Sequence, residues 1–155
     1  MNNEITETIN LSDYMATERY EVISNETLSD CIQKDLNISG SLLSQSHFKN
    51  VTFSNCAFFG SRIEKCTFIG VTFENCTFQF SHLQDCTFIS CTFKNCRWTS
   101  TGINGSDMEG CLLDVKTMFY VSKYDNKLQG CFRDCLLYTS PSPRDQRGSR
   151  MPSSA

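Results

Sequence analysis

Large apolar side chains recur at every fifth position along most of the chain. From Leu43 to Met118, sixteen successive positions spaced by five hold Leu, Ile, Met, Phe or Trp without a gap. A helix would place residues five apart about 140° from each other, and a single strand would turn every second one to the opposite face. The pattern therefore predicts neither a helix nor a plain strand, but a chain that turns once in every five residues.

The cysteines follow the same period. Nine of the ten lie at positions with one shared remainder on division by five, two residues before the apolar series. We interpret each unit as three extended residues that point in, out and in, followed by a two-residue corner, so that Cys66 and Phe68 face the interior and Thr67 faces outward.

A longer period sets the number of sides of this coil. Residues 51–70 and 71–90 match at eleven of twenty positions, so four units make one turn. Stacked turns at a spacing of about 4.8 Å would give four columns of core side chains, one aliphatic and three aromatic. The predicted core consists of Phe48, Phe53, Phe58, Ile63, Phe68, Phe73, Phe78, Leu83, Phe88, Phe93 and Trp98, with the thiols of Cys56, Cys66, Cys76, Cys86, Cys91 and Cys96.

These units resemble the repeat of the pentapeptide-repeat family, which reads small residue, polar residue, Leu or Phe, and two variable residues. Val51–Asn55, Cys66–Gly70 and Cys86–Ser90 fit that template. The resemblance implies an all-β protein whose fold is a right-handed quadrilateral β-helix, a β-solenoid, here of about four to five coils of 20 residues. This chain departs from the family by using Cys, Ser or Val where Ala is frequent, which changes packing volume more than topology.

The strength of the pattern predicts the organisation of the chain. The solenoid covers residues 36–120. Residues 1–20 are expected to form an N-terminal lead or cap, and residues 21–35 irregular first repeats with a bulge or loop at Gln33, which occupies a core position. Residues 121–134 are expected to be a decaying repeat, because Lys123 and Arg133 fall on core positions. Each end of a solenoid must be capped or paired, since it leaves a rung without a neighbour.

The last segment differs in composition from everything before it. All three prolines lie in the final fifteen residues, and the run Cys135–Asp145 resembles the translation of a sequencing adapter. We therefore interpret residues 135–155 as disordered adapter read-through and exclude them from the fold, the alternative being a native Ser/Pro tail. On this interpretation the natural chain continues beyond Asp134, and a homodimer through the missing C-terminal end is one way to cover the last rung.

The positions of the cysteines and histidines favour a structural role over a catalytic or metal-binding one. No Cys-x-x-Cys pair is present, and His47 and His82 should point outward, so we expect no metal, no cofactor and no catalytic residues. Buried cysteines pack as small apolar side chains. Disulfides between stacked cysteines fit the Cα spacing, but parallel side chains and a cytosolic setting argue against them. An enzyme is therefore not expected.

Charge and hydropathy narrow the class of protein. The formal charge of −3 is too small to indicate nucleic-acid binding through a basic patch. No apolar run approaches the length of a membrane span, and the first residues lack the pattern of a secretory signal. We expect a bacterial cytoplasmic protein without a membrane span, with secretion as an effector left open.

Apolar residues at outward positions indicate where a partner would bind. Phe59 and Phe80 share one side with Arg97, Ile69 and Ile89 stack on another, and Arg62, Glu64, Lys65, His82 and Asp85 form a charged wall between them. The predicted partner-binding residues are Phe59, Phe80, Arg97, Ile69, Ile89, Arg62 and His82. The alternative interpretation is ordinary scattered surface residues.

The resemblance implies two functions. The first is a rigid scaffold for protein–protein interaction, which also includes effector-like proteins. The alternative is a DNA-mimicking, gyrase-binding protein of the quinolone-resistance type. Residues 1–35 carry a balance of −6, while residues 36–134 carry nine bases and eight acids. Because the rod lacks the acidic field that imitation of DNA requires, the scaffold is favoured.

Overall fold

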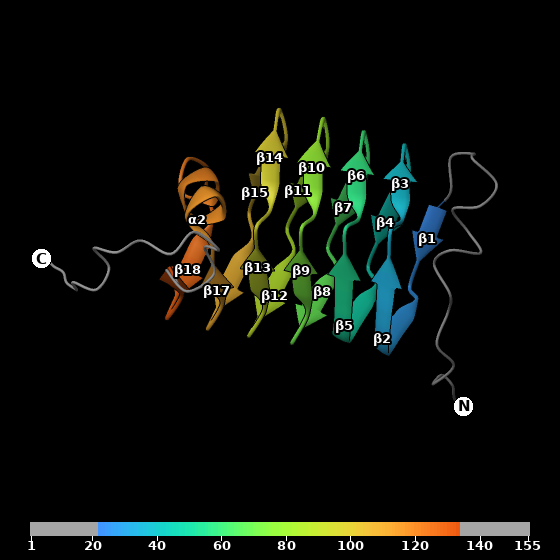
Figure 1. The fold of residues 1–155 in the computed structure, drawn as a ribbon, viewed down its shortest axis with the longest axis horizontal. Helices are drawn as coiled ribbons and strands as arrows, with labels where there is room; N and C mark the ends of the chain where they lie inside the picture. Colours follow the sequence, from blue (N-terminus) through green and yellow to red (C-terminus); the bar gives the residue numbers. More distant parts are fainter. Residues whose placement is uncertain (1–21, 134–155) are drawn as a thin grey trace, which may run out of the picture.

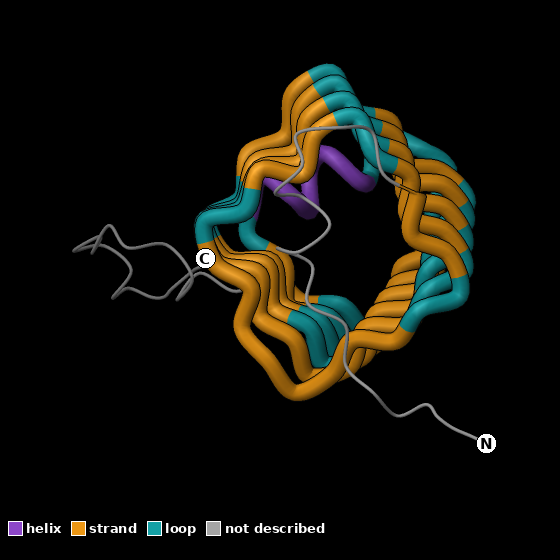
Figure 2. Tube along the Cα trace, turned by 90° about the vertical axis from the view of Figure 1, so that its right-hand side faces the viewer, coloured by secondary structure: helices purple, strands orange, loops and turns teal. Residues whose placement is uncertain are grey.

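The computed structural model describes residues 22–133, which wind into a parallel β-solenoid of about 6 turns with a square cross-section (Figures 1 and 2). The expected lead over residues 1–20 and the expected read-through over residues 135–155 lie outside the described residues. The predicted right-handed quadrilateral β-helix is confirmed. The turns exceed the four to five expected, because strands at both ends join the coil.

Each side of the square is one ladder of parallel strands. The β7 side consists of β1 (Val22–Ser24), β4 (Leu42–Ser44), β7 (Arg62–Glu64), β11 (His82–Gln84) and β15 (Gly102–Asn104). The β6 side consists of β3 (Asn37–Ser39), β6 (Ala57–Phe59), β10 (Thr77–Gln79) and β14 (Arg97–Thr99).

The other two sides join into one sheet because β2 (Thr27–Lys34) and β5 (His47–Ser54) run unbroken around the corner between them. The β8 side contains the first halves of β2 and β5, then β8 (Thr67–Ile69), β12 (Thr87–Ile89), β16 (Asp107–Glu109) and β18 (Lys127–Gln129). The β9 side contains their second halves, then β9 (Thr72–Glu74), β13 (Thr92–Lys94), β17 (Leu112–Leu113) and β19 (Phe132–Arg133). Along the chain the sides follow in the order β6, β7, β8, β9.

The strands begin one residue later than predicted. The short strands hold the second, third and fourth residues of each unit, which point out, in and out, as in Thr67–Ile69. The small first residue, such as Cys66, lies in the corner with its side chain directed inward. The predicted directions of Cys66, Thr67 and Phe68 are confirmed, but the predicted strand limits were wrong by one position, and each side presents two outward columns instead of one.

The fifth residue of the unit makes the corner. Every residue from 25 to 110 whose number is divisible by five has a positive φ, between 46° and 68°. Gly, Asn and Asp occupy most of these positions, because they adopt the left-handed conformation at least cost. Neighbouring corners also bond to each other: Asn95 Nδ2 donates to Asn75 Oδ1 at 2.6 Å, and Asn55 Nδ2 to Asp35 Oδ1 at 2.7 Å.

The interior consists of four columns of stacked side chains. Phe48 and Phe68 stack with ring centroids 4.9 Å apart, and Phe73 and Phe93 with centroids 4.7 Å apart. The column of the β7 side is aliphatic throughout, as predicted, and contains Ile23, Leu43, Ile63, Leu83 and Ile103. All of the expected core residues are buried except Trp98, which is partly exposed at the C-terminal end of its column.

A helix replaces two sides of the last full turn. The sequence predicted repeats to residue 120, but helix α2 (Val115–Val121) begins after β17, so Met118 lies in the helix and not in a strand. Asp114 caps the helix by accepting from Thr117 N at 2.7 Å. The helix covers Trp98: Tyr120 stacks on the indole with centroids 5.4 Å apart. The coil then resumes as β18 and β19, so the expected decay after residue 120 is an interruption instead.

The first rung is regular. The expected bulge or loop at Gln33 was wrong, because β2 pairs with β5 residue by residue and places Gln33 beside Phe53. The side chain of Gln33 turns inward, and its Nε2 lies 3.4 Å from Cys31 Sγ, which gives the buried amide a polar partner.

Candidate functional site

Two exposed aromatic rings meet at the corner between the β6 and β7 sides. Phe59 ends β6, and Phe80 follows β10 on the next rung. The side chains are 46% and 56% exposed, yet their rings contact edge to face with centroids 5.5 Å apart. Most large apolar side chains of the described residues are buried in the core, so an exposed pair of contacting phenylalanine rings is unusual in this protein. We call this pair the aromatic corner.

The backbone of Phe80 is in a conformation that phenylalanine disfavours. Its φ is 52°, at the same corner position where the preceding rungs carry Gly40 and Gly60 and the next carries Ser100. A bulky residue in the left-handed region costs on the order of 1 kcal/mol relative to Gly or Asn. Burial does not repay this cost, since the ring is exposed. Strain of this kind collects at functional sites.

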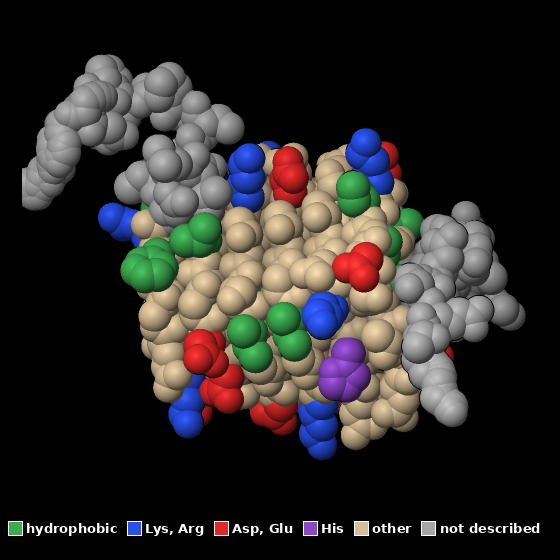
Figure 3. Space-filling model, turned by 90° about the horizontal axis from the view of Figure 1, so that it is seen from below, with side chains coloured by type: hydrophobic (Ala, Val, Ile, Leu, Met, Phe, Trp, Pro, Cys, Tyr) green, Lys and Arg blue, Asp and Glu red, His purple; other side chains and the backbone are tan. Residues whose placement is uncertain are grey.

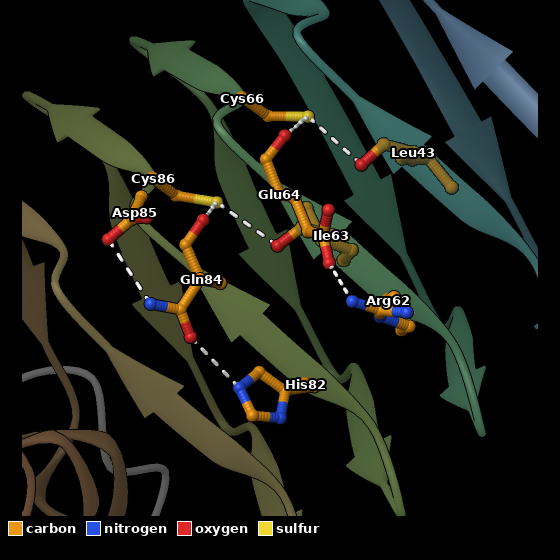
Figure 4. A network of polar contacts seen from close by, with 9 residues as sticks. All are labelled: Leu43, Arg62, Ile63, Glu64, Cys66, His82, Gln84, Asp85 and Cys86. Carbon is orange, nitrogen blue, oxygen red and sulfur yellow. Dashed lines mark hydrogen bonds and ion pairs between the residues drawn. The ribbon is translucent and has the colours of Figure 1, made fainter.

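Polar side chains flank the aromatic corner on the β7 side. Arg62 forms an ion pair with Glu64 along the same strand, and His82 bonds to Gln84 Oε1 at 3.1 Å through Nε2 (Figure 4). Arg62 and His82 are neighbours in one outward column. The β7 side therefore presents a row of basic, acidic and amide groups beside the two rings.

The other predicted partner-binding residues lie apart from this corner. Arg97 is exposed on the β6 side, but it begins β14 and so lies at the opposite end of the strands from Phe59. Ile69 and Ile89 are neighbours on the β8 side, in a column that runs Lys49, Ile69, Ile89 and Glu109.

The isoleucine pair ends its strands at the corner that leads to the β9 side, diagonally across the square from Phe80. In the view of Figure 3, two hydrophobic side chains lie together between basic and acidic ones, an order that matches this column. The seven predicted residues therefore do not form one surface. Arg97 lies at another corner, and a partner on the aromatic corner would not reach Ile69 and Ile89 without wrapping around the prism.

The inward-pointing thiols donate hydrogen bonds to backbone carbonyl oxygens at the corners. Cys66 Sγ lies 3.5 Å from the carbonyl oxygens of Leu43 and Glu64, and Cys86 makes the same two contacts one rung later (Figure 4). Serines at equivalent corners, such as Ser81, do likewise. Alanine could not make these bonds, so this chain's Cys and Ser add polar satisfaction to the packing.

Burial makes most of these thiols unreactive near neutral pH. It raises the pKa of Cys66 to about 11 and of Cys86 and Cys96 to about 12. Within residues 22–133, no group of three or more His, Cys, Asp or Glu side chains is arranged to hold a metal ion. Over the same residues, no helix is long and apolar enough to cross a membrane.

Comparison with known families agrees with the geometry. The family model described as the pentapeptide repeat region matches residues 46–122. The chain belongs to the pentapeptide-repeat family. The matched segment contains the aromatic corner and most of the solenoid, and it ends just after α2. No curated protein sequence matches the chain.

The solved structures found by comparison include two other pentapeptide-repeat proteins and QnrB1, all three with TM-scores below 0.5. Rfr23 from the cyanobacterium Cyanothece 51142 is 10% identical with a TM-score of 0.42, over 81% of this chain and 95% of that one. A thylakoid-lumen pentapeptide-repeat protein from Arabidopsis thaliana is 18% identical with a TM-score of 0.35, over 84% and 90%. QnrB1, a plasmid-mediated fluoroquinolone resistance protein, is 11% identical with a TM-score of 0.24, over 72% and 70%. These likenesses do not indicate what this pentapeptide-repeat protein binds.

The sequence contained a second indication of the aromatic corner, besides the outward position of its apolar residues. Among the positions divisible by five from 25 to 110, Phe80 is the one apolar residue with a side chain. Outward direction made Phe59 and Phe80 candidates, but only the left-handed corner shows that Phe80 breaks the local rule.

Proposed function

We propose that this pentapeptide-repeat protein is a non-enzymatic, rigid scaffold that binds another protein through the aromatic corner. The observation that carries the proposal is the exposed ring of Phe80 on a backbone where its neighbours in the column are Gly and Ser. Sequences keep locally unfavourable choices mainly where function uses them. A contact with a partner would bury both rings and offset the strain.

The surroundings fit a protein partner. Interface energy concentrates in a few aromatic and Arg side chains surrounded by polar residues. Phe59 and Phe80 supply the aromatic centre, and Arg62, Glu64, His82 and Gln84 supply a polar rim on the β7 side. Because hydrogen bonds join each rung to the next, the rings are held on a stiff surface and little order is lost on binding.

A photo-crosslinker placed beside the rings tests the proposal. Gln79 is the strand neighbour of Phe59, so p-benzoylphenylalanine at position 79 would lie at the corner. The same probe at Ile69, on the diagonally opposite corner, is the matched control. After irradiation in bacterial cells, we expect one specific adduct from position 79, no such adduct from position 69, and loss of the adduct when Phe59→Ser is added.

Two results would contradict the proposal. One is equal crosslinking from positions 79 and 69, which would indicate unspecific contact. The other is an adduct from position 79 that persists in the Phe59→Ser and Phe80→Asn variants.

The charge of the rod does not favour imitation of DNA. Residues 22–133 carry ten acidic and ten basic side chains, so the described solenoid is neutral, whereas duplex DNA presents a dense negative field. In a gyrase supercoiling assay, we expect the protein to give no protection against a quinolone. Protection that disappears with added salt would instead support the gyrase-binding alternative.

A further inference from the structure

Three thiols form a ladder along the corner between the β8 and β9 sides. Cys91, Cys111 and Cys131 each precede a strand of the β9 side, one rung apart. Leu112 N donates to Cys91 O at 2.9 Å and Phe132 N to Cys111 O at 2.8 Å, which fixes adjacent rungs in register. Strand spacing of about 4.8 Å lies within the Cα range of disulfides. Parallel side chains oppose the bond between inner rungs, but β19 is the last described strand and both its residues are exposed, so this strand can shift to bring the two sulfurs together. A cytosolic setting opposes a permanent disulfide and is compatible with a reversible one.

The ladder opens at its C-terminal end. Cys91 and Cys111 are buried, whereas Cys131 is only partly buried. The ladder of Cys56, Cys76 and Cys96 is closed by comparison, because Asp114 Oδ2 accepts from Cys96 N at 2.9 Å and occupies the next corner. A reagent in solvent therefore meets Cys131 before any other member of its ladder.

The thiols of Cys111 and Cys131, the two nearest the C-terminal end of the ladder, differ in acidity. The neighbouring thiol of Cys91 lowers the pKa of Cys111, while the thiol of Cys131 donates to Met108 O at 3.5 Å. Burial raises the pKa of Cys131. The Cys111 thiol is therefore the more acidic of the two, and its burial suits attack on a neighbouring sulfur and not on a molecule in solution.

We propose that Cys131 and Cys111 form a reversible disulfide by exchange with a low-molecular-weight disulfide such as oxidised glutathione. The Cys131 thiolate attacks one sulfur of glutathione disulfide, forms a mixed disulfide and releases one glutathione thiolate. The Cys111 thiolate then attacks Cys131 Sγ, and the second glutathione leaves as thiolate. The protein loses two electrons, and glutathione disulfide gains them.

The bond would staple the last rung to the coil. It closes a ring over residues 111–131, which contains α2 and β18, and ties β19 to β17. The residues of β19 are exposed, and the sulfur link would hold this strand where few side-chain contacts do. Oxidation is therefore expected to slow amide hydrogen exchange in β18 and β19 by about tenfold or more.

Peptide mapping tests the inference directly, because trypsin separates the two cysteines. Cleavage after Arg97 and Lys116 gives peptide 98–116 with Cys111 alone, and cleavage after Lys127 and Arg133 gives peptide 128–133 with Cys131 alone. The full chain with Cys135→Ser is incubated with glutathione disulfide, trapped with N-ethylmaleimide, denatured and digested. We expect the two peptides linked, at a rate that rises about tenfold per pH unit below the pKa of Cys131.

Cysteine-to-serine variants separate the steps. Serine occupies equivalent corners in this chain, for example Ser46 and Ser106, so the variants should fold. Cys111→Ser should leave glutathione on Cys131, Cys131→Ser should abolish all modification of the ladder, and the Cys96→Ser control should change nothing. A mixed disulfide that persists on Cys131 of the parent chain, a link between Cys91 and Cys111, or no modification would each overturn the proposal.

Discussion

The phenol of Tyr120 forms two hydrogen bonds with the backbone of Thr101 and thereby ends a column of hydroxyl groups. Thr101 N donates to the phenol oxygen at 2.9 Å, and the phenol donates to Thr101 O at 2.6 Å. Ser61 N and Ser81 N each donate to the hydroxyl one rung later in the same column. Tyr120 of α2 thus ends this column, because its phenol oxygen accepts the hydrogen bond that a Ser or Thr hydroxyl accepts on the earlier rungs.

Removing the phenol should destabilise the C-terminal turn. Tyr120→Phe leaves the peptide N–H and C=O of Thr101 without these partners, so we expect a loss of about 1–3 kcal/mol in unfolding free energy. Urea denaturation followed by circular dichroism measures it. The exposed Tyr124→Phe should change stability by only a few tenths of a kcal/mol, and equal losses from both variants would contradict the role given to Tyr120.

Asp114 ends a second column and begins the helix with one carboxylate. Its Oδ1 accepts from Thr117 N and its Oδ2 from Cys96 N. Asp114→Ala should therefore cost about 2–4 kcal/mol, more than a typical cap, because both the helix and a buried corner lose their acceptor. Asp114→Asn keeps one acceptor oxygen and should cost clearly less. Equal losses for Ala and Asn would contradict this account, because the remaining oxygen of Asn can still cap α2.

The period of five and the stacked core could be predicted from the sequence because core identity repeats strictly. Phe48 above Phe68 follows from spacing alone. The strand limits could not, since apolar spacing does not say which residue turns the chain; the left-handed fifth residue decides it. Helix α2 was missed because Met118 keeps the apolar register, although Lys116 breaks the small-residue position and Asp114 is a good N-cap.

The candidate surface was partly predictable. Phe59 and Phe80 were identified because they are apolar residues at outward positions. Separating them from Ile69 and Ile89 needed the structure, which shows at which end of its strand each residue lies. The corner geometry places the two pairs diagonally across the square.

A single ring removed from the interior should have a large effect. Phe73 contacts ring neighbours above, below and beside it, among them Phe53 and Phe93. Phe73→Ala should cost about 3–5 kcal/mol through the cavity it leaves. Thermal unfolding compared with Thr72→Ala, an outward neighbour, checks this. A loss below about 1 kcal/mol would be inconsistent with a close-packed column.

Stability should fall at alkaline pH. Burial holds the pKa of Cys66 at about 11 and of Cys86 at about 12 in the folded protein, above the value of 9.0 for an unperturbed thiol. Above pH 9 the unfolded chain therefore releases protons that the folded chain retains, so the free energy of unfolding decreases with pH between about 9 and 12.

Urea midpoints at pH 7.5, 9 and 10 measure this dependence. The double variant Cys66→Ser, Cys86→Ser should show a shallower decline, because serine does not ionise in this range. An unchanged slope would mean that other groups cause the alkaline loss.

Phe80→Asn tests the central claim most directly, because it separates binding from folding. Asn suits the left-handed corner, and this relief offsets the lost contact with Phe59, so unfolding free energy should change by less than about 1 kcal/mol. The measurement is the yield of the position-79 photoadduct from Phe80→Asn and parent proteins of verified equal stability. We predict at least a tenfold loss of adduct, and an undiminished yield would contradict the aromatic corner as the docking site.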